Sequence, residues 1–155
     1  MDAFLGQLGM VLCFGMAALG SAAGIWSAGR AAAGAWARDA KAGIPLRFNY
    51  IIFVGAPISQ TFYAMIVMNQ MAGLLAHPAA VAQYSGLLLA IGIATGLGEL
   101  FSAWGQGLIG AAACRALSEG EGKGLAFLLI AIGIIETVGI FTMVFMLGRV
   151  PVVPA

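Results

Sequence analysis

Charged residues are scarce in this 155-residue chain. Asp, Glu, Lys and Arg together make up 8% of the sequence, against about 25% in soluble domains, and the formal net charge is +1. Apolar residues reach 62%, and the mean hydropathy is +1.02. Too little polar surface remains to cover a water-soluble globule, which excludes a soluble enzyme and a disordered segment. We therefore expect an integral membrane protein.

Cysteines are few, and no run of basic residues is present. Cys13 and Cys114 lie in different apolar segments, so they cannot form the disulfide framework of a small secreted domain, and we expect two free, buried thiols. Without Lys and Arg clustered on one face, a nucleic-acid-binding surface is excluded. The first residues contain no basic region, so we expect no removable signal peptide and a first apolar segment that stays in place as a span.

Long apolar runs are abundant instead. A helix needs roughly 20 mostly apolar residues to cross the hydrocarbon layer of a bilayer. Four continuous stretches meet this requirement, namely about 4–35, 48–75, 81–113 and 125–147. Because they do not alternate between apolar and polar residues, they exclude a β-barrel. The sequence predicts an all-α membrane protein with four transmembrane helices joined by short turns.

Basic residues are distributed unevenly between the connections. Six of the seven flank the first or the third connection: Arg30, Arg38, Lys41, Arg47, Arg115 and Lys123. Arg149 alone lies on the other side. The positive-inside rule then predicts that loops 36–47 and 114–124 face the cytoplasm and that both termini face outward.

The two halves of the chain resemble each other. A shift of 78 residues superimposes four positions on identical residues: Gly20, Trp26, Gly29 and Ala33 on Gly98, Trp104, Gly107 and Ala111. A shift of 76 superimposes Gln60-Thr61 on Glu136-Thr137. We interpret the chain as two tandem helical hairpins, 1–78 and 79–155. The many small residues allow helices to approach closely, either within one chain or in the inner layer of an oligomeric ring.

Glu136 lies near the middle of the fourth span. A charged side chain at this depth costs about 2.5–3.5 kcal/mol on insertion scales. Nothing in its own helix neutralises the charge, so the carboxyl group must be protonated, paired or bound to a cation. This residue is the first candidate for a functional group.

Further oxygen atoms are expected close to Glu136. They belong to the side chains of Gln60, Gln106 and Ser59 and to a backbone carbonyl near Ala56 or Phe53, which Pro57 can free from the helix. Such hard ligands suit Na⁺, whereas a proton site needs one acceptor or none. Each Gln taken singly also fits a hydrogen bond between helices. Tyr63 can hydrogen-bond the carboxylate, and Thr61 and Thr137 are supporting groups or bond back to their own helices.

The chain resembles the proteolipid rotor-ring subunit (c-type) of V-type ATPases. The resemblance is carried by the runs Pro57–Tyr63 and Leu100–Gly107, the duplicated hairpin and the single Glu136. The resemblance covers nearly the whole chain and is strongest to the bacterial sodium-pumping branch. It implies identical copies forming a ring in the bacterial plasma membrane and turning against a stator subunit with an essential Arg. Stalk subunits would bind the cytoplasmic loops, and ATP would be hydrolysed in a separate soluble head, with no catalytic site in this chain.

The same resemblance implies a ligand set and a stoichiometry. The Na⁺ ligands would be the side chains of Glu136, Gln60, Gln106 and Ser59 and the backbone carbonyl of Ala56. Tyr63 would hold the glutamate while the ion is bound. One ion per chain is implied, because Gln60 stands where the first hairpin would otherwise carry its carboxylate.

Two residues depart from the family pattern. Ile58 stands where a Gly is expected. Glu99 fits a second carboxylate near the ion path, a protonated group facing the lumen of the ring, or a partner for another helix.

Two other functions stay open. They are a proton-carrying V-type rotor subunit and a small proton-coupled exporter, for which Tyr63 and Trp104 are the aromatic candidates near the acid.

Overall fold

A computed structural model describes residues 2–152, and within them every regular element is helical. The elements are α1 (Asp2–Lys41), α2 (Tyr50–Gly55), the short 3₁₀ helix η1 (Ala56–Ile58), α3 (Ser59–Leu75), α4 (Pro78–Glu119) and α5 (Leu125–Leu147). Because α2, η1 and α3 follow one another directly, they form one rod. The four resulting rods are each long and apolar enough to cross a membrane. The predicted all-α fold with four spans is confirmed.

Two of the helices are longer than hydrophobicity alone indicated. The first helix continues past residue 35 to Lys41, and the third rod starts at Pro78 and ends at Glu119. At 1.5 Å per residue each of them measures about 60 Å, roughly twice the hydrocarbon thickness of a bilayer. Their polar ends therefore extend beyond the apolar layer. Water solvates the polar side chains there, so the helix can continue.

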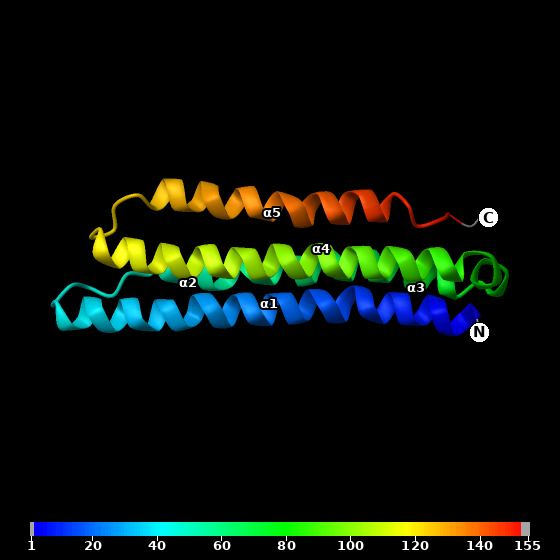
Figure 1. The fold of residues 1–155 in the computed structure, drawn as a ribbon, viewed down its shortest axis with the longest axis horizontal. Coiled ribbons are helices and arrows are strands. Elements are labelled where there is room, and N and C mark those ends of the chain that lie inside the picture. Colours follow the sequence, from blue (N-terminus) through cyan, green and yellow to red (C-terminus); the bar gives the residue numbers. More distant parts are fainter. Residues whose placement is uncertain (1, 153–155) are drawn as a thin grey trace.

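The rods lie antiparallel, as Figure 1 shows. Helix α1 lies beside α4 along most of its length, α2 and α3 lie behind this pair, and α5 runs along the other side of α4. The N- and C-terminal ends lie at the same end of the bundle. Both longer connections, 42–49 and 120–124, lie at the opposite end, which is the arrangement expected for two successive hairpins.

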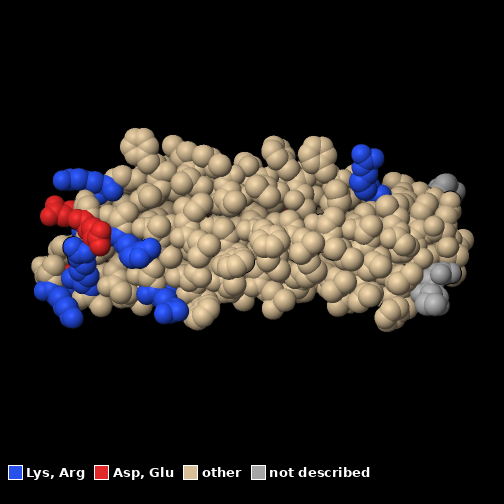
Figure 2. Space-filling model, viewed as in Figure 1, with Lys and Arg blue, Asp and Glu red and all other residues tan. Residues whose placement is uncertain are grey.

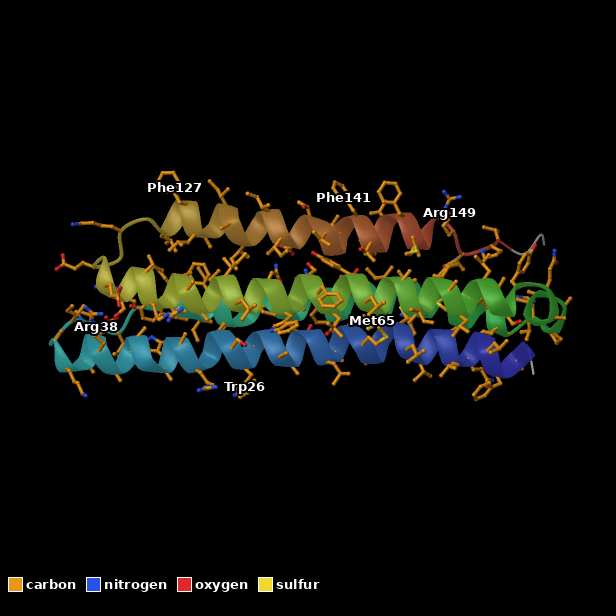
Figure 3. The ribbon with its side chains drawn as sticks, in the orientation of Figure 1. Trp26, Arg38, Met65, Phe127, Phe141 and Arg149 are labelled. Carbon is orange, nitrogen blue, oxygen red and sulfur yellow. The ribbon has the colours of Figure 1, made fainter. Side chains whose placement is uncertain are left out.

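Charge is concentrated at the end that carries these two connections. Figure 2 shows Lys, Arg, Asp and Glu gathered there, while the middle of the visible face is uncharged. Arg149 lies toward the other end, and Phe127 and Phe141 of α5 point away from the bundle (Figure 3). An apolar belt between two polar ends is the surface expected of a membrane-spanning bundle.

Glycine allows the backbones of α1 and α4 to touch. A side chain at Gly92 would overlap the backbone of Gly9, and one at Gly107 would overlap the backbone of Gly24. The small residues predicted to mediate close packing therefore do so within the chain. Direct backbone contact makes α1 and α4 the most closely packed pair of the fold.

A buried polar cluster fastens the loop that joins the first hairpin's two rods. The Asp39 side chain is 1% exposed and accepts hydrogen bonds from Arg47 Nη1 and Tyr50 Oη, both at 2.9 Å. Ser118 Oγ of α4 donates to the same carboxylate at 3.3 Å. The hydrogen bond with Tyr50 and, to a smaller extent, the charge of Asp39 raise the pKa of Arg47. Arg47 therefore stays positively charged.

Replacing Gly107 by Ala should destabilise the bundle. The new methyl group would collide with the Gly24 backbone, and such overpacking costs about 1–3 kcal/mol. Gly34→Ala is the matched control, since nothing lies within 4 Å of its added Cβ, and it should unfold no earlier than the parent. Thermal loss of far-UV circular dichroism in detergent measures both, and equal midpoints would contradict the assigned contact.

Asp39→Ala should lower the unfolding midpoint by roughly 5–10 °C, because it removes the acceptor of the buried Tyr50 hydroxyl group and the charge partner of Arg47. The control is Glu119→Ala, which breaks the exposed 3.3 Å ion pair with Arg38 and should shift the midpoint far less. The same thermal measurement compares the two variants. A larger effect at Glu119 would show that the Asp39 cluster does not stabilise the loop.

Candidate ion-binding site

Glu136 lies midway along α5 and turns toward α3. Tyr63 Oη donates a hydrogen bond to Glu136 Oε1 at 2.9 Å, so the two residues that the sequence paired are in contact. Both side chains are half-buried. The carboxylate is thus held between two helices while keeping some access to the outer surface of the bundle.

The second rod is interrupted at the level of this site by η1. Pro57 lacks a backbone N–H, and the chain tightens there into a 3₁₀ turn over Ala56–Ile58. Ser59 Oγ lies 2.9 Å from the Ala56 carbonyl oxygen and 2.8 Å from Gln60 Oε1. A hydroxyl group has one proton, so only one of these oxygens receives it at a time and the other stays free for a ligand.

Ile58, which stands where a Gly was expected, fits this turn without strain. Its backbone has φ −71° and ψ −24°, a right-handed helical conformation open to any residue, and its side chain points outward with 43% exposure. The change from the family pattern therefore leaves the local backbone geometry intact.

The Gln60 amide is fully buried and oriented by α4 and α5. Its Nε2 donates to Ser102 Oγ at 3.2 Å, and Ser102 Oγ donates in turn to the Ile135 carbonyl at 2.9 Å. With Nε2 engaged on α4, Oε1 is directed toward Ser59. Sequence reasoning did not assign a role to Ser102, although it lies in the run Leu100–Gly107 that carried the family resemblance.

Gln106 is fully buried one helical turn beyond Ser102. Neither its Oε1 nor its Nε2 has a hydrogen-bond partner among residues 2–152. An unsatisfied buried polar group costs about 1–3 kcal/mol, and such a group in a native fold calls for an explanation such as a bound ion or water. Gln106 is thus an amide available to a ligand.

Thr61 and Thr137 do not reach the carboxylate. Thr61 Oγ1 donates to Ser21 Oγ of α1 at 2.7 Å, and Ser21 Oγ donates to the Pro57 carbonyl at 2.6 Å. Thr137 Oγ1 donates to the Ile134 carbonyl of its own helix. The first pair stabilises the 3₁₀ turn from the α1 side, and the second bond leaves Thr137 on the surface of α5.

Taken together, the oxygens suit a monovalent cation. Within residues 2–152, no group of three or more His, Cys, Asp or Glu side chains comes together to hold a metal ion. The donors are instead one carboxylate with amide, hydroxyl and backbone carbonyl oxygens, a set that hard cations prefer. One carboxylate and one monovalent cation leave no net charge, which the membrane interior requires.

The comparison with known families agrees with this geometry. The family model of the ATP synthase C subunit matches residues 8–71 and 89–147, more than half of the chain. The first match covers most of α1 through α3 and the second covers most of α4 and α5, which confirms the predicted tandem repeat. No curated protein matches the chain. The chain belongs to the ATP synthase C subunit family and is a c-type rotor subunit, a membrane proteolipid that carries coupling ions and has no catalytic site of its own.

Proposed function

We propose that this chain carries Na⁺ in the rotor ring of a bacterial V-type ATPase. The observation that carries the proposal is the set of neutral oxygens on the helices that pack against α5, the helix of the mid-membrane carboxylate Glu136. Ser59 and Gln60 lie beside the carbonyl of Ala56, and the buried Gln106 amide has no protein partner in the described chain. A proton would need none of them, whereas Na⁺ must replace its lost hydration water with several such ligands.

The Glu136–Tyr63 pair defines the loaded state of the site. Glu136 supplies the negative charge, and Na⁺ neutralises it, so the loaded protein faces lipid without an electrostatic penalty. The Tyr63 hydroxyl fixes the carboxylate at 2.9 Å and keeps its second oxygen, Oε2, available to the ion. Loss of the ion leaves a bare carboxylate, which must take up a proton or pair with another positive charge.

In the proposed cycle that positive charge is the essential Arg of a stator subunit. When the ring brings Glu136 to the stator, the Arg pairs with the carboxylate and the ion leaves through a water-filled path. Identical copies in the ring repeat this exchange. Stalk subunits bound to loops 36–47 and 114–124, which we assign to the cytoplasmic side, transmit rotation driven by ATP hydrolysis in a soluble head.

Two alternatives have less support. A proton-carrying rotor subunit needs Glu136 and Tyr63 but gives the buried amide of Gln106 no role. A proton-coupled exporter needs aromatic side chains around the acid, yet Trp104 stacks on Phe101 at 6.4 Å and lines a hollow with Leu19 on the α1–α4 surface.

Carbodiimide labelling tests the proposal directly, because the reagent modifies protonated carboxyl groups in apolar sites. Labelling of the purified protein, mapped by mass spectrometry, should occur at Glu136, increase as pH falls and be suppressed by Na⁺ but not by choline. Labelling at Glu136 that is indifferent to Na⁺ would overturn the sodium assignment in favour of a proton rotor. Absence of labelling at Glu136 would show that another group carries the ion.

Gln106→Leu should weaken the protection by Na⁺ about tenfold or more, because removing a ligand worth about 1–3 kcal/mol changes affinity by that order. Labelling of Glu136 in the absence of Na⁺ should persist. The matched control is Gln70→Leu, at an exposed position of α3, which should leave protection unchanged. Equal Na⁺ protection in the two variants would remove Gln106 from the ligand set.

A further inference from the structure

Glu99 is a fully buried acid on α4 to which the proposed ion site gives no role. Its side chain is 0% exposed, and neither carboxyl oxygen has a hydrogen-bond partner among residues 2–152. Neither of the two ion pairs in this part of the chain involves it. A buried carboxyl group without a counter-charge takes up a proton instead of staying charged. Glu99 is therefore an uncharged group, and its packing contacts define what it does.

Those contacts decide between the three interpretations that the sequence allowed for Glu99. A group facing the lumen of a ring would be exposed in a single chain, and Glu99 has no exposure. A second carboxylate in the ion path would need room for an ion, but the Gln60 amide and the Gly139 backbone pack against this carboxyl group. The remaining interpretation is a partner for another helix, which Glu99 contacts by packing.

Gly139 of α5 is the point at which Glu99 meets Gln60. A Cβ atom at position 139 would lie 2.6 Å from Glu99 Oε2, 3.1 Å from Gln60 Nε2 and 3.2 Å from Gln60 Cγ. Side chains from α4 and α3 thus converge on one buried backbone position of α5. Only glycine leaves room for both side chains where they are.

Both side chains are held in place around Gly139. Gln60 Nε2 donates to Ser102 Oγ, which donates in turn to the Ile135 carbonyl, one turn before Gly139 on α5. Glu99 is fully buried, so its carboxyl group can move only by displacing its neighbours. A methyl group at position 139 would therefore push α5 outward or push the Gln60 amide out of place.

Such a displacement would reach the proposed site, because Gly139 lies three residues after Glu136 on the same helix. Gln60 Oε1 is 2.8 Å from Ser59 Oγ, and Glu136 is held by Tyr63 of α3. The seating of α5 on α3 and α4 sets how far the Gln60 oxygen lies from the carboxylate. Groups that orient metal ligands from outside the coordination shell typically change metal affinity by 10–100-fold when they are mutated.

We infer that Glu99 and Gly139 form a size-matched pair that positions the Gln60 amide and α5 for ion binding. Both are positioning residues, and neither is a ligand. The inference rests on the proposed sodium function and deepens the description of its site. Glu99 fills the space that the missing side chain of Gly139 leaves, so a larger residue at 139 requires a smaller one at 99. The size of Glu99 matters here, and its charge does not.

Protection of Glu136 by Na⁺ against carbodiimide labelling measures the effect of this pair. Gly139→Ala should raise the Na⁺ concentration for half-protection about tenfold. Glu99→Ala should also raise it, because the Gln60 amide loses the side chain that packs beside it. The double variant should need less Na⁺ than Gly139→Ala, since the smaller residue at 99 makes room for the methyl group. Far-UV circular dichroism checks that each variant remains helical.

Two further variants separate size from charge and from general packing. Glu99→Gln keeps the size of the uncharged side chain, so parental protection should be retained. The matched control is Gly133→Ala, three residues before Glu136 on α5, where nothing lies within 4 Å of the added Cβ. It should protect like the parent.

A Gln60→Ala background tests whether the pair acts through Gln60. With the amide absent, adding Gly139→Ala should cause no further loss of Na⁺ protection. A purely structural role would lower protection again in this background, and that result would overturn the positioning role.

The remaining outcomes separate the inference from the sodium function. Equal protection in Gly139→Ala and Gly133→Ala, with the parent protected, would overturn the pair and leave the sodium function intact. Additive losses in the double variant, or loss of protection in Glu99→Gln, would overturn the size matching. Absence of Na⁺ protection in the parent would overturn the sodium function itself, and the inference with it.

Discussion

The charge of a carboxylate in the hydrocarbon layer must be cancelled, and the architecture around Glu136 follows from that requirement. The carboxylate is kept in place by Tyr63 and left half-buried, and α3 and the apolar part of α4, which pack against α5, carry neutral polar groups and no Lys or Arg. A fixed Lys or Arg would neutralise the charge permanently. In the proposed site, neutral ligands instead make neutrality conditional on a bound ion, which is what an ion carrier requires.

The 3₁₀ turn at Pro57 shows how backbone and side chains share this task. Ser21 and Thr61 stabilise the turn from the α1 side, while Ser59 and Gln60 face the site on the other. The interruption of a membrane helix normally exposes unsatisfied backbone groups, but here the neighbouring hydroxyl groups compensate for them. The turn can therefore present the Ala56 carbonyl without weakening the rod.

Much of this arrangement is predictable from the sequence. The four spans follow from continuous apolar runs, and Glu136 is conspicuous because charge at that depth is expensive. The Tyr63–Glu136 contact followed from the family resemblance and from helical spacing. The grouping of Ser59 with Gln60 was expected because the two are adjacent in sequence.

Other features depend on how helices face one another, which one sequence does not reveal. The link from Gln60 through Ser102 to Ile135 joins three helices, and no local pattern distinguishes Ser102 from an ordinary small residue. The Asp39 cluster was equally hidden, because Asp39 resembles an ordinary loop charge until Tyr50 and Ser118 are seen around it. The long helices extend past their apolar runs because polar residues tolerate helix outside the bilayer.

The glycine contacts between α1 and α4 also determine which parts of the chain are free to move. Because their backbones are in contact, those two helices cannot slide or rotate against each other without collision, so they form a rigid pair. Helix α5 has only Ile132 and Gly139 buried among the described residues, so it is held by far less buried surface than α1 and α4. Glu136 therefore lies on the least buried of the four rods, where a helix can shift with the least loss of packing while the α1–α4 pair keeps its shape.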